Sequence, residues 1–95
     1  MKTFNRLALA RALHARLDLP LDRAKGVVDT TLEVLADALT EGQKIEFRQF
    51  GVMEVVVRRP KIGRNPKKPE NAYQIPARRA VRFRACQHLF HRLNP

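Results

Sequence analysis

The sequence predicts an α+β fold: a hairpin of two helices, a three-stranded antiparallel sheet, a protruding two-stranded β-ribbon arm and a short C-terminal helix. Three observations predict it. Apolar residues recur at helical spacing through residues 21–40, and apolar and charged residues alternate with period two through residues 44–48. From residue 58 onward, basic residues and prolines replace the apolar ones, and edge ribbons tolerate proline whereas central strands exclude it.

A single domain accounts for all 95 residues, because two hydrophobic cores do not fit into this length. If the arm projects into solvent, about seventy residues remain to build a core, a size at which oligomerisation is a common remedy. The expected parts are the helical hairpin (1–42), the sheet (43–57 and 77–84), the protruding arm (58–76) and the C-terminal helix (85–95).

The helical hairpin is predicted from its caps and its apolar faces. Thr3 or Asn5 can cap a first helix that ends near Leu17, and Pro20 suits the opening of a second helix over residues 21–40. The first helix is apolar on two sides, which favours burial on two sides, as in an intertwined dimer. The second helix has one apolar face, formed by Ala24, Val27, Val28, Thr31, Leu35, Ala38 and Leu39.

An acidic spine runs along the opposite face of the second helix. Asp29, Glu33 and Asp37 follow one another at intervals of four residues. We interpret them as a solvated surface whose negative charge would repel an anion such as phosphate. The second helix of a helix-turn-helix protein would instead present a basic, polar recognition face to DNA. The sequence therefore argues against that class, and Gly42 supplies the stop of the helix.

The sheet is predicted from two strands and a tight turn. After the alternating residues 44–48, Gln49-Phe50-Gly51 is typical of a turn with Phe50 in the core, and a second strand extends over residues 52–57. A return strand is expected over residues 73–83. A helix over residues 85–93 ends the chain, with one face formed by Cys86, Leu89, Phe90 and Leu93.

Positive charge is concentrated between residues 58 and 84. This stretch holds ten of the nineteen Lys and Arg and one acid, Glu70, whereas residues 1–57 carry eight charges of each sign. Like charges that crowd together weaken a compact fold, so a polyanionic partner explains them better, and nucleic acid is the first candidate. The candidate contact residues are Arg58, Arg59, Lys61, Arg64, Asn65, Pro66, Lys67, Lys68, Arg78, Arg79, Arg82 and Arg84.

Pro66 suggests that the ribbon contacts the bases as well as the phosphates. Its ring is rigid, apolar and without an N–H, so it can wedge between stacked base pairs. The neighbouring Arg64 and Asn65 suit the acceptor-rich floor of the minor groove. We therefore expect Pro66 to be an intercalating residue.

Over essentially its whole length, the sequence resembles the bacterial HU/integration host factor (IHF) family. The resemblance is carried by Gly63-Arg64-Asn65-Pro66, by Phe50-Gly51 and by residues 75–84. It implies a dimer whose helices interlock and whose two arms embrace the DNA minor groove. Proteins of this family are known to insert apolar wedges between base pairs. It also implies that Pro66 occupies the intercalating position and that Phe50 and Phe83 occupy core positions.

Three features depart from the family pattern. Lys67-Lys68-Pro69 stands where the family usually has a residue followed by Thr-Gly, and this alters the tip of the arm. Cys86 stands where the family commonly has Gly, at the start of the last helix. The N-terminus is a few residues longer than usual.

Other chemistries find little support in the sequence. Helical spacing puts His88 and His91 on the face opposite Cys86, so these three side chains cannot converge on a metal ion. We expect no cofactor, no small-molecule substrate and no catalytic set of residues. A lone cysteine fits a reducing compartment, and no run of about eighteen apolar residues exists to span a membrane, so we expect a cytosolic, unprocessed chain.

These observations lead to one principal hypothesis and two alternatives. The principal hypothesis is a non-enzymatic, architectural dimer of the nucleoid that binds the minor groove of double-stranded DNA and bends it with little sequence preference. It is expected to be a homodimer, with a heterodimer of related chains as the alternative. A site-specific, IHF-like DNA-bending protein is a second hypothesis, favoured by residues 77–81. A structural RNA-binding protein is a third, although the wide minor groove of A-form RNA fits a narrow arm poorly.

Overall fold

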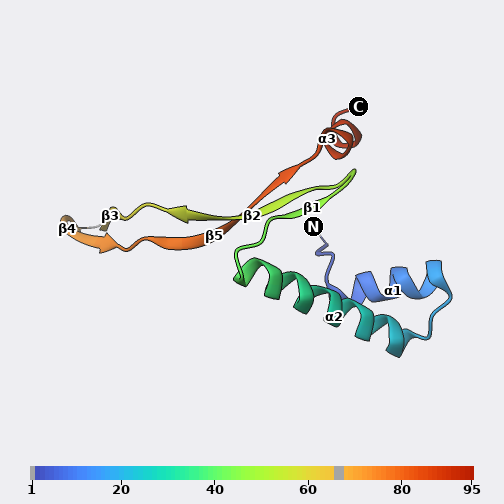
Figure 1. Ribbon diagram of the computed structural model, residues 1–95. Helices are drawn as coiled ribbons and strands as arrows, with labels where there is room; N and C mark the ends of the chain where they lie inside the picture. The colour runs from blue at the N-terminus through green and yellow to red at the C-terminus, as the bar shows by residue number, and fades with distance from the viewer. Residues whose placement is uncertain (1, 66–67) are drawn as a thin grey trace. The chain divides into compact units, whose positions relative to one another are not determined.

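The computed structural model describes residues 2–65 and 68–95, and for residues 61, 64–65 and 68–74 it describes the backbone. The predicted α+β class is confirmed (Figure 1). The chain forms two compact units, residues 1–40 and 41–95, which are described separately below. The elements in chain order are α1 (Arg6–Leu17), α2 (Leu21–Thr40), β1 (Ile45–Phe47), β2 (Gly51–Arg58), β3 (Lys61–Asn65), β4 (Lys68–Ile75), β5 (Arg78–Ala85) and α3 (Gln87–Leu93).

In the helical unit, local hydrogen bonds set where the helices begin. Of the two predicted caps, Asn5 is the one used: its side-chain oxygen accepts from the backbone N–H of Ala8 at 3.0 Å. Asp18 ends α1 in the left-handed conformation, with φ 55°. The carbonyl of Pro20 then accepts from the N–H of Ala24 at 3.0 Å, so α2 begins at the predicted residue.

A small core joins the two helices. Ala10, Ala24 and Val28 are buried there, and the side chains packed against them are Leu9, Leu13, Leu21 and Leu32. Two residues of the predicted apolar face of α2, Val27 and Thr31, are exposed instead. The predicted face is wider than the buried one because a single 12-residue partner helix covers only one side of α2. Further exposed apolar side chains of this unit are Phe4, Leu7, Leu17 and Val34.

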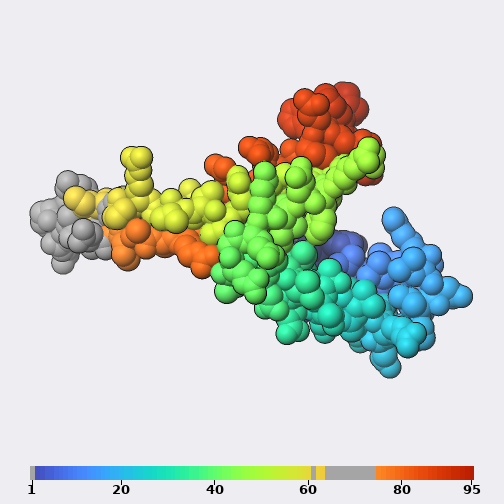
Figure 2. Space-filling view, viewed as in Figure 1, coloured from blue at the N-terminus to red at the C-terminus, as the bar shows by residue number. Residues whose placement is uncertain are grey.

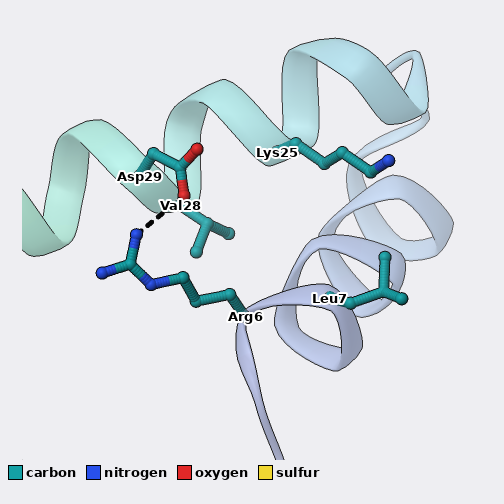
Figure 3. A pocket seen from close by; sticks show the side chains of 5 residues that line it. All are labelled: Arg6, Leu7, Lys25, Val28 and Asp29. Carbon is teal, nitrogen blue, oxygen red and sulfur yellow. Dashed lines mark hydrogen bonds and ion pairs between the residues drawn. The ribbon is translucent and has the colours of Figure 1, made fainter.

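The mouth of the hairpin holds an open pocket of about 210 Å³ (Figure 3). The guanidinium of Arg6 reaches from α1 to the carboxylate of Asp29 on α2, at 3.1 Å. Both side chains are largely exposed, so this pair adds little to stability. Asp29 is therefore solvated, as its place in the acidic spine predicts.

The strand unit contains two antiparallel sheets. β1, β2 and β5 form a three-stranded sheet in the order β1-β2-β5, and β3 pairs with β4 in a two-stranded ribbon. The ladder between β2 and β5 ends with Arg58 opposite Arg78, and pairing resumes with Lys61 opposite Ile75. The predicted unbroken return strand 73–83 is wrong, because the structure interrupts it between β4 and β5. Pro76 lies in this interruption and cannot donate a ladder hydrogen bond, and Pro60 lies in the interruption between β2 and β3.

The turn between β1 and β2 depends on a glycine. The N–H of Phe50 donates to the carbonyl of Phe47 at 3.0 Å, and Gln49 takes a left-handed φ of 66°. A Cβ on Gly51 would lie 2.7 Å from the carbonyl oxygen of Arg84 and 2.8 Å from the ring of Phe83. Only glycine at position 51 therefore lets β5 approach the start of β2 this closely.

Phe50 does not enter a closed core within this chain. Its ring packs on that of Phe83 with centroids 5.6 Å apart, yet about half of each side chain is exposed. The prediction that Phe50 is folded into the core is wrong for the single chain, because no described residue covers the outer side of this aromatic pair.

The last helix begins two residues later than predicted. Ala85 is the final residue of β5, where it pairs with Gly51, and Cys86 is the N-cap. The sulfur of Cys86 accepts from the N–H of Leu89 at 3.5 Å, and its own N–H donates to the carbonyl of Phe50 at 3.0 Å. The cap residue therefore ties α3 to the turn between β1 and β2.

Candidate nucleic-acid interface

The register between β2 and β5 sorts the sheet into two chemically different faces. Residues that oppose one another in an antiparallel ladder point to the same side, and successive residues alternate between sides. Near the ribbon, the yellow end of β2 and the orange start of β5 lie against each other (Figure 2). One face carries the pairs Met53–Phe83, Val55–Val81 and Val57–Arg79. The other carries Val52–Arg84, Glu54–Arg82, Val56–Ala80 and Arg58–Arg78.

Four arginines dominate the second face, which we call the basic sheet face: Arg58, Arg78, Arg82 and Arg84. All four are exposed, and two of them oppose each other at the end of the ladder nearest the ribbon. Guanidinium groups match phosphate oxygens as bidentate donors, so a row of exposed arginines along a strand is suited to a nucleic-acid backbone. The structure thus brings four of the predicted contact residues together on one surface.

Glu54 interrupts this surface and was missed from the sequence. The guanidinium of Arg82 donates to the Glu54 carboxylate across the two strands, and this hydrogen bond holds the pKa of Glu54 below its ordinary value of 4.5. The side chain of Glu54 is 26% exposed and that of Arg82 is 55% exposed. An acid inside a run of valines was visible in the sequence, but only the register reveals its partner.

Arg79 lies apart from the other arginines of β5. It opposes Val57 on the apolar side of the sheet, and one of its guanidinium nitrogens lies 3.8 Å from the position that a Cβ on Gly42 would occupy. Arg78 and Arg79 are adjacent in sequence, so their side chains point to opposite faces of the sheet.

The ribbon carries the remaining predicted residues. Its backbone places Lys61, Arg64 and Asn65 on β3 and Lys68 on β4, with a register shift between Arg64 and Asn65. Exposed Arg59 lies between β2 and β3. The two residues that connect the strands, Pro66 and Lys67, fall outside the described residues, so the predicted wedge stays a prediction.

The first face of the sheet is apolar and incompletely covered. Val57 is 70% exposed, and Phe47, Val81 and Phe83 are each about half exposed. On α3, Phe90 and Leu93 are also exposed. Exposed apolar side chains that gather on one face of a sheet are typical of interaction surfaces.

Among the side chains that the structure describes, no cluster of three or more His, Cys, Asp or Glu could hold a metal ion. The sulfur of Cys86 accepts a backbone hydrogen bond, and the ring of His91 lies against that of Phe90 with centroids 5.9 Å apart. None of the described helices has the length and apolar content needed to cross a membrane.

An arginine-lined antiparallel sheet that leads into a basic two-stranded ribbon defines a class of nucleic-acid-binding proteins that use strands rather than a recognition helix. The sequence matches the family described as bacterial DNA-binding protein over residues 4–94. The chain therefore belongs to this family, that of the HU and IHF proteins, and the resemblance found in the sequence is confirmed.

Individual relatives agree with this assignment. The chain is 48% identical over 62 residues to the probable DNA-binding protein HU of Chlamydia trachomatis, an alignment that covers 65% of this chain and 62% of that protein's length. It is 39% identical over 85 residues to the integration host factor subunit alpha of Caulobacter vibrioides, covering 90% of this chain and 84% of that protein. The fold is similar to that in an Anabaena HU–DNA cocrystal structure, with a TM-score of 0.87, 28% identity, and coverage of 96% and 98% of the two chains.

Proposed function

We propose that the protein is a non-enzymatic, architectural DNA-binding protein of the nucleoid that binds double-stranded DNA and bends it with little sequence preference. The observation that carries the proposal is the basic sheet face, whose arginines stand on the two strands that lead into the basic ribbon. Membership of the HU/IHF family and similarity to an HU protein that was crystallised with DNA support the same partner.

The active form in this proposal is a dimer. Apolar side chains are exposed on both helices of the hairpin, on one face of the sheet and on α3. Burial of apolar surface stabilises by about 25 cal/mol per Å², so a second copy that covers these surfaces supplies stability that the single chain lacks. A homodimer requires nothing beyond this chain, and a heterodimer with a related chain is the alternative.

The ribbon is proposed to enter the minor groove, where Pro66 intercalates. Arg and Lys side chains along the ribbon would hold phosphates on either side of the groove, and Arg64 and Asn65 would contact its floor. Unstacking a base step costs a few kcal/mol, and the bent duplex recovers this free energy by touching more protein.

Bending and its dependence on Pro66 can be measured together. A short duplex labelled at both ends reports the bend by energy transfer, and circularisation of a longer duplex reports it independently. The parent protein should bend both, and Pro66→Ala should bend them much less while retaining most of the affinity, because phosphate contacts remain. Pro69→Ala removes another ribbon proline and is the matched control. Equal bending by the parent and Pro66→Ala would contradict intercalation.

Site-specific binding is a second candidate, because integration host factor alpha subunits align with about nine tenths of this chain. Competition between a random duplex and a site selected from a random library distinguishes the two functions. A dissociation-constant ratio near one supports general architectural binding, whereas a ratio of about a thousand or more supports site-specific binding.

A further inference from the structure

A row of alternating charge crosses the sheet beside the arginines. Glu54 of β2 stands opposite Arg82 of β5 and pairs with it. On the other side, the pairing of Ile45 with Met53 brings Lys44, which precedes β1, next to Glu54. One carboxylate is therefore flanked by two cations on the same face.

The carboxylate of Glu54 is ionised at neutral pH. The hydrogen bond from Arg82 lowers its pKa most, partial burial acts in the opposite direction, and the charges of Arg82, Arg84 and Lys44 lower the pKa further. A negative charge thus persists in the middle of the basic sheet face under the conditions in which DNA is bound.

This charge divides the basic sheet face into two parts. At the ribbon end, Arg58 and Arg78 oppose each other, and no described acidic side chain pairs with either. Along the same face, the next pair is Val56–Ala80, and the pair after that is Glu54–Arg82. There Arg82 already donates to a carboxylate, which compensates its charge. A phosphate that approaches Arg82 must displace Glu54 or accept its repulsion, because both anions compete for the same guanidinium.

We propose that Glu54 is an attenuating residue of the DNA interface: by neutralising Arg82 it weakens phosphate binding at the middle of the sheet and directs strong contacts to the ribbon end. The inference rests on the proposed function, because it assigns a role to one residue within that interface. It has a direct consequence, since loss of the carboxylate should create a phosphate contact that the parent protein lacks.

The test measures the dissociation constant for a random-sequence duplex by fluorescence anisotropy across a series of salt concentrations. Glu54→Gln should tighten binding by about fivefold and steepen the plot of log K against log salt by up to about one unit, because one more cation becomes available to phosphate. Glu46→Gln is the matched control: Glu46 opposes Val52 on the same face and makes no ion pair with a described side chain. Glu46→Gln removes one negative charge, as Glu54→Gln does, but it frees no arginine from an ion pair. It should therefore change affinity by less than about twofold.

Arginine variants make the test independent of how Glu54→Gln folds. In the parent protein, Arg82→Gln should weaken binding less than Arg78→Gln does, because Arg82 is already neutralised. The double variant Glu54→Gln/Arg82→Gln should lose the gain of Glu54→Gln. Equal effects of Glu54→Gln and Glu46→Gln, a gain that survives in the double variant, or equal losses for Arg82→Gln and Arg78→Gln would each overturn the inference. If the parent protein itself fails to bind the duplex, the proposed function fails instead.

Discussion

The two faces of the β2–β5 sheet are built from the same two strands, yet they differ in chemistry. One face is mainly methionine, valine and phenylalanine, with Arg79 near the ribbon, and the other carries four arginines and a paired glutamate among smaller apolar residues. Neighbours in sequence, such as Phe83 and Arg84, therefore belong to different surfaces. Period-two alternation thus gives one strand two surfaces of different chemistry, one suited to an apolar partner and the other to a polyanion.

The two faces also differ in how complete they are. The ion pair and exposed arginines of the basic sheet face are compatible with water, so this face is stable before a partner arrives. The apolar face, with Val57 and Phe83 exposed, gains free energy only when something covers it. In the proposed dimer, protein therefore occupies one face permanently, while DNA occupies the other reversibly.

A substitution of Phe83 on the apolar face should reduce stability more than any other change considered below. If a second copy covers this ring, Phe83→Ala should lower the free energy of unfolding by about 3 kcal/mol, as for a buried aromatic residue. If the ring stays half exposed, about half of that loss is expected. Thermal unfolding at several protein concentrations measures the effect and its dependence on association.

Arg84→Ala is the matched control, because it changes the next residue along and the opposite face. It should alter the free energy of unfolding by less than about 0.5 kcal/mol and should weaken DNA binding instead. A concentration-independent loss of about 1.5 kcal/mol for Phe83→Ala would argue against a covered apolar face.

A smaller effect separates Arg78 from Arg79, which are adjacent but point to opposite faces. Arg78→Ala should weaken binding to a random duplex by about fivefold and reduce the salt slope by about one unit, because one phosphate contact is lost. Arg79→Ala should leave the salt slope unchanged. Anisotropy titrations across salt concentrations measure both quantities, and equal losses of slope for the two variants would contradict the assignment of faces.

The sequence predicted the elements that local rules determine. Residues 21–40 became α2 because caps and a helical period agree, and Asn5 capped α1 because its short side chain reaches the backbone. Alternation alone could separate Arg78 from Arg79, but only the register placed Arg58 on the same face and Arg82 opposite Glu54. The return strand was predicted as continuous, because the sequence alone does not give the pairing. The register shows that residues 59–60 and 76–77, which contain Pro60 and Pro76, lie opposite each other where the pairing stops. Phe50 and Phe83 were predicted as core residues from the turn pattern and the family resemblance, but each is about half exposed, because no described residue of this chain covers the outer side of the pair.

The smallest effect concerns the ion pair on the basic sheet face and its dependence on pH. Since the folded protein lowers the pKa of Glu54 below 4.5, the folded state binds fewer protons than the unfolded state in that range. The stabilisation from the pair is therefore fully present above pH 4.5 and is lost as the pH falls through the lowered value. Compared with Glu54→Gln, the parent protein should have the higher melting temperature at neutral pH, and the difference should shrink below pH 4.5.

Arg82→Gln decides whether the pair itself causes this pH dependence. Without the guanidinium, the largest cause of the lowered pKa is absent, so Glu54 should contribute little pH-dependent stability. Melting temperatures of the two single variants and the double variant between pH 3 and pH 7 then form a double-mutant cycle. A coupling that disappears on acidification assigns the effect to the pair, whereas a coupling of constant size would show that Glu54 and Arg82 interact through packing of their side-chain stems rather than through charge.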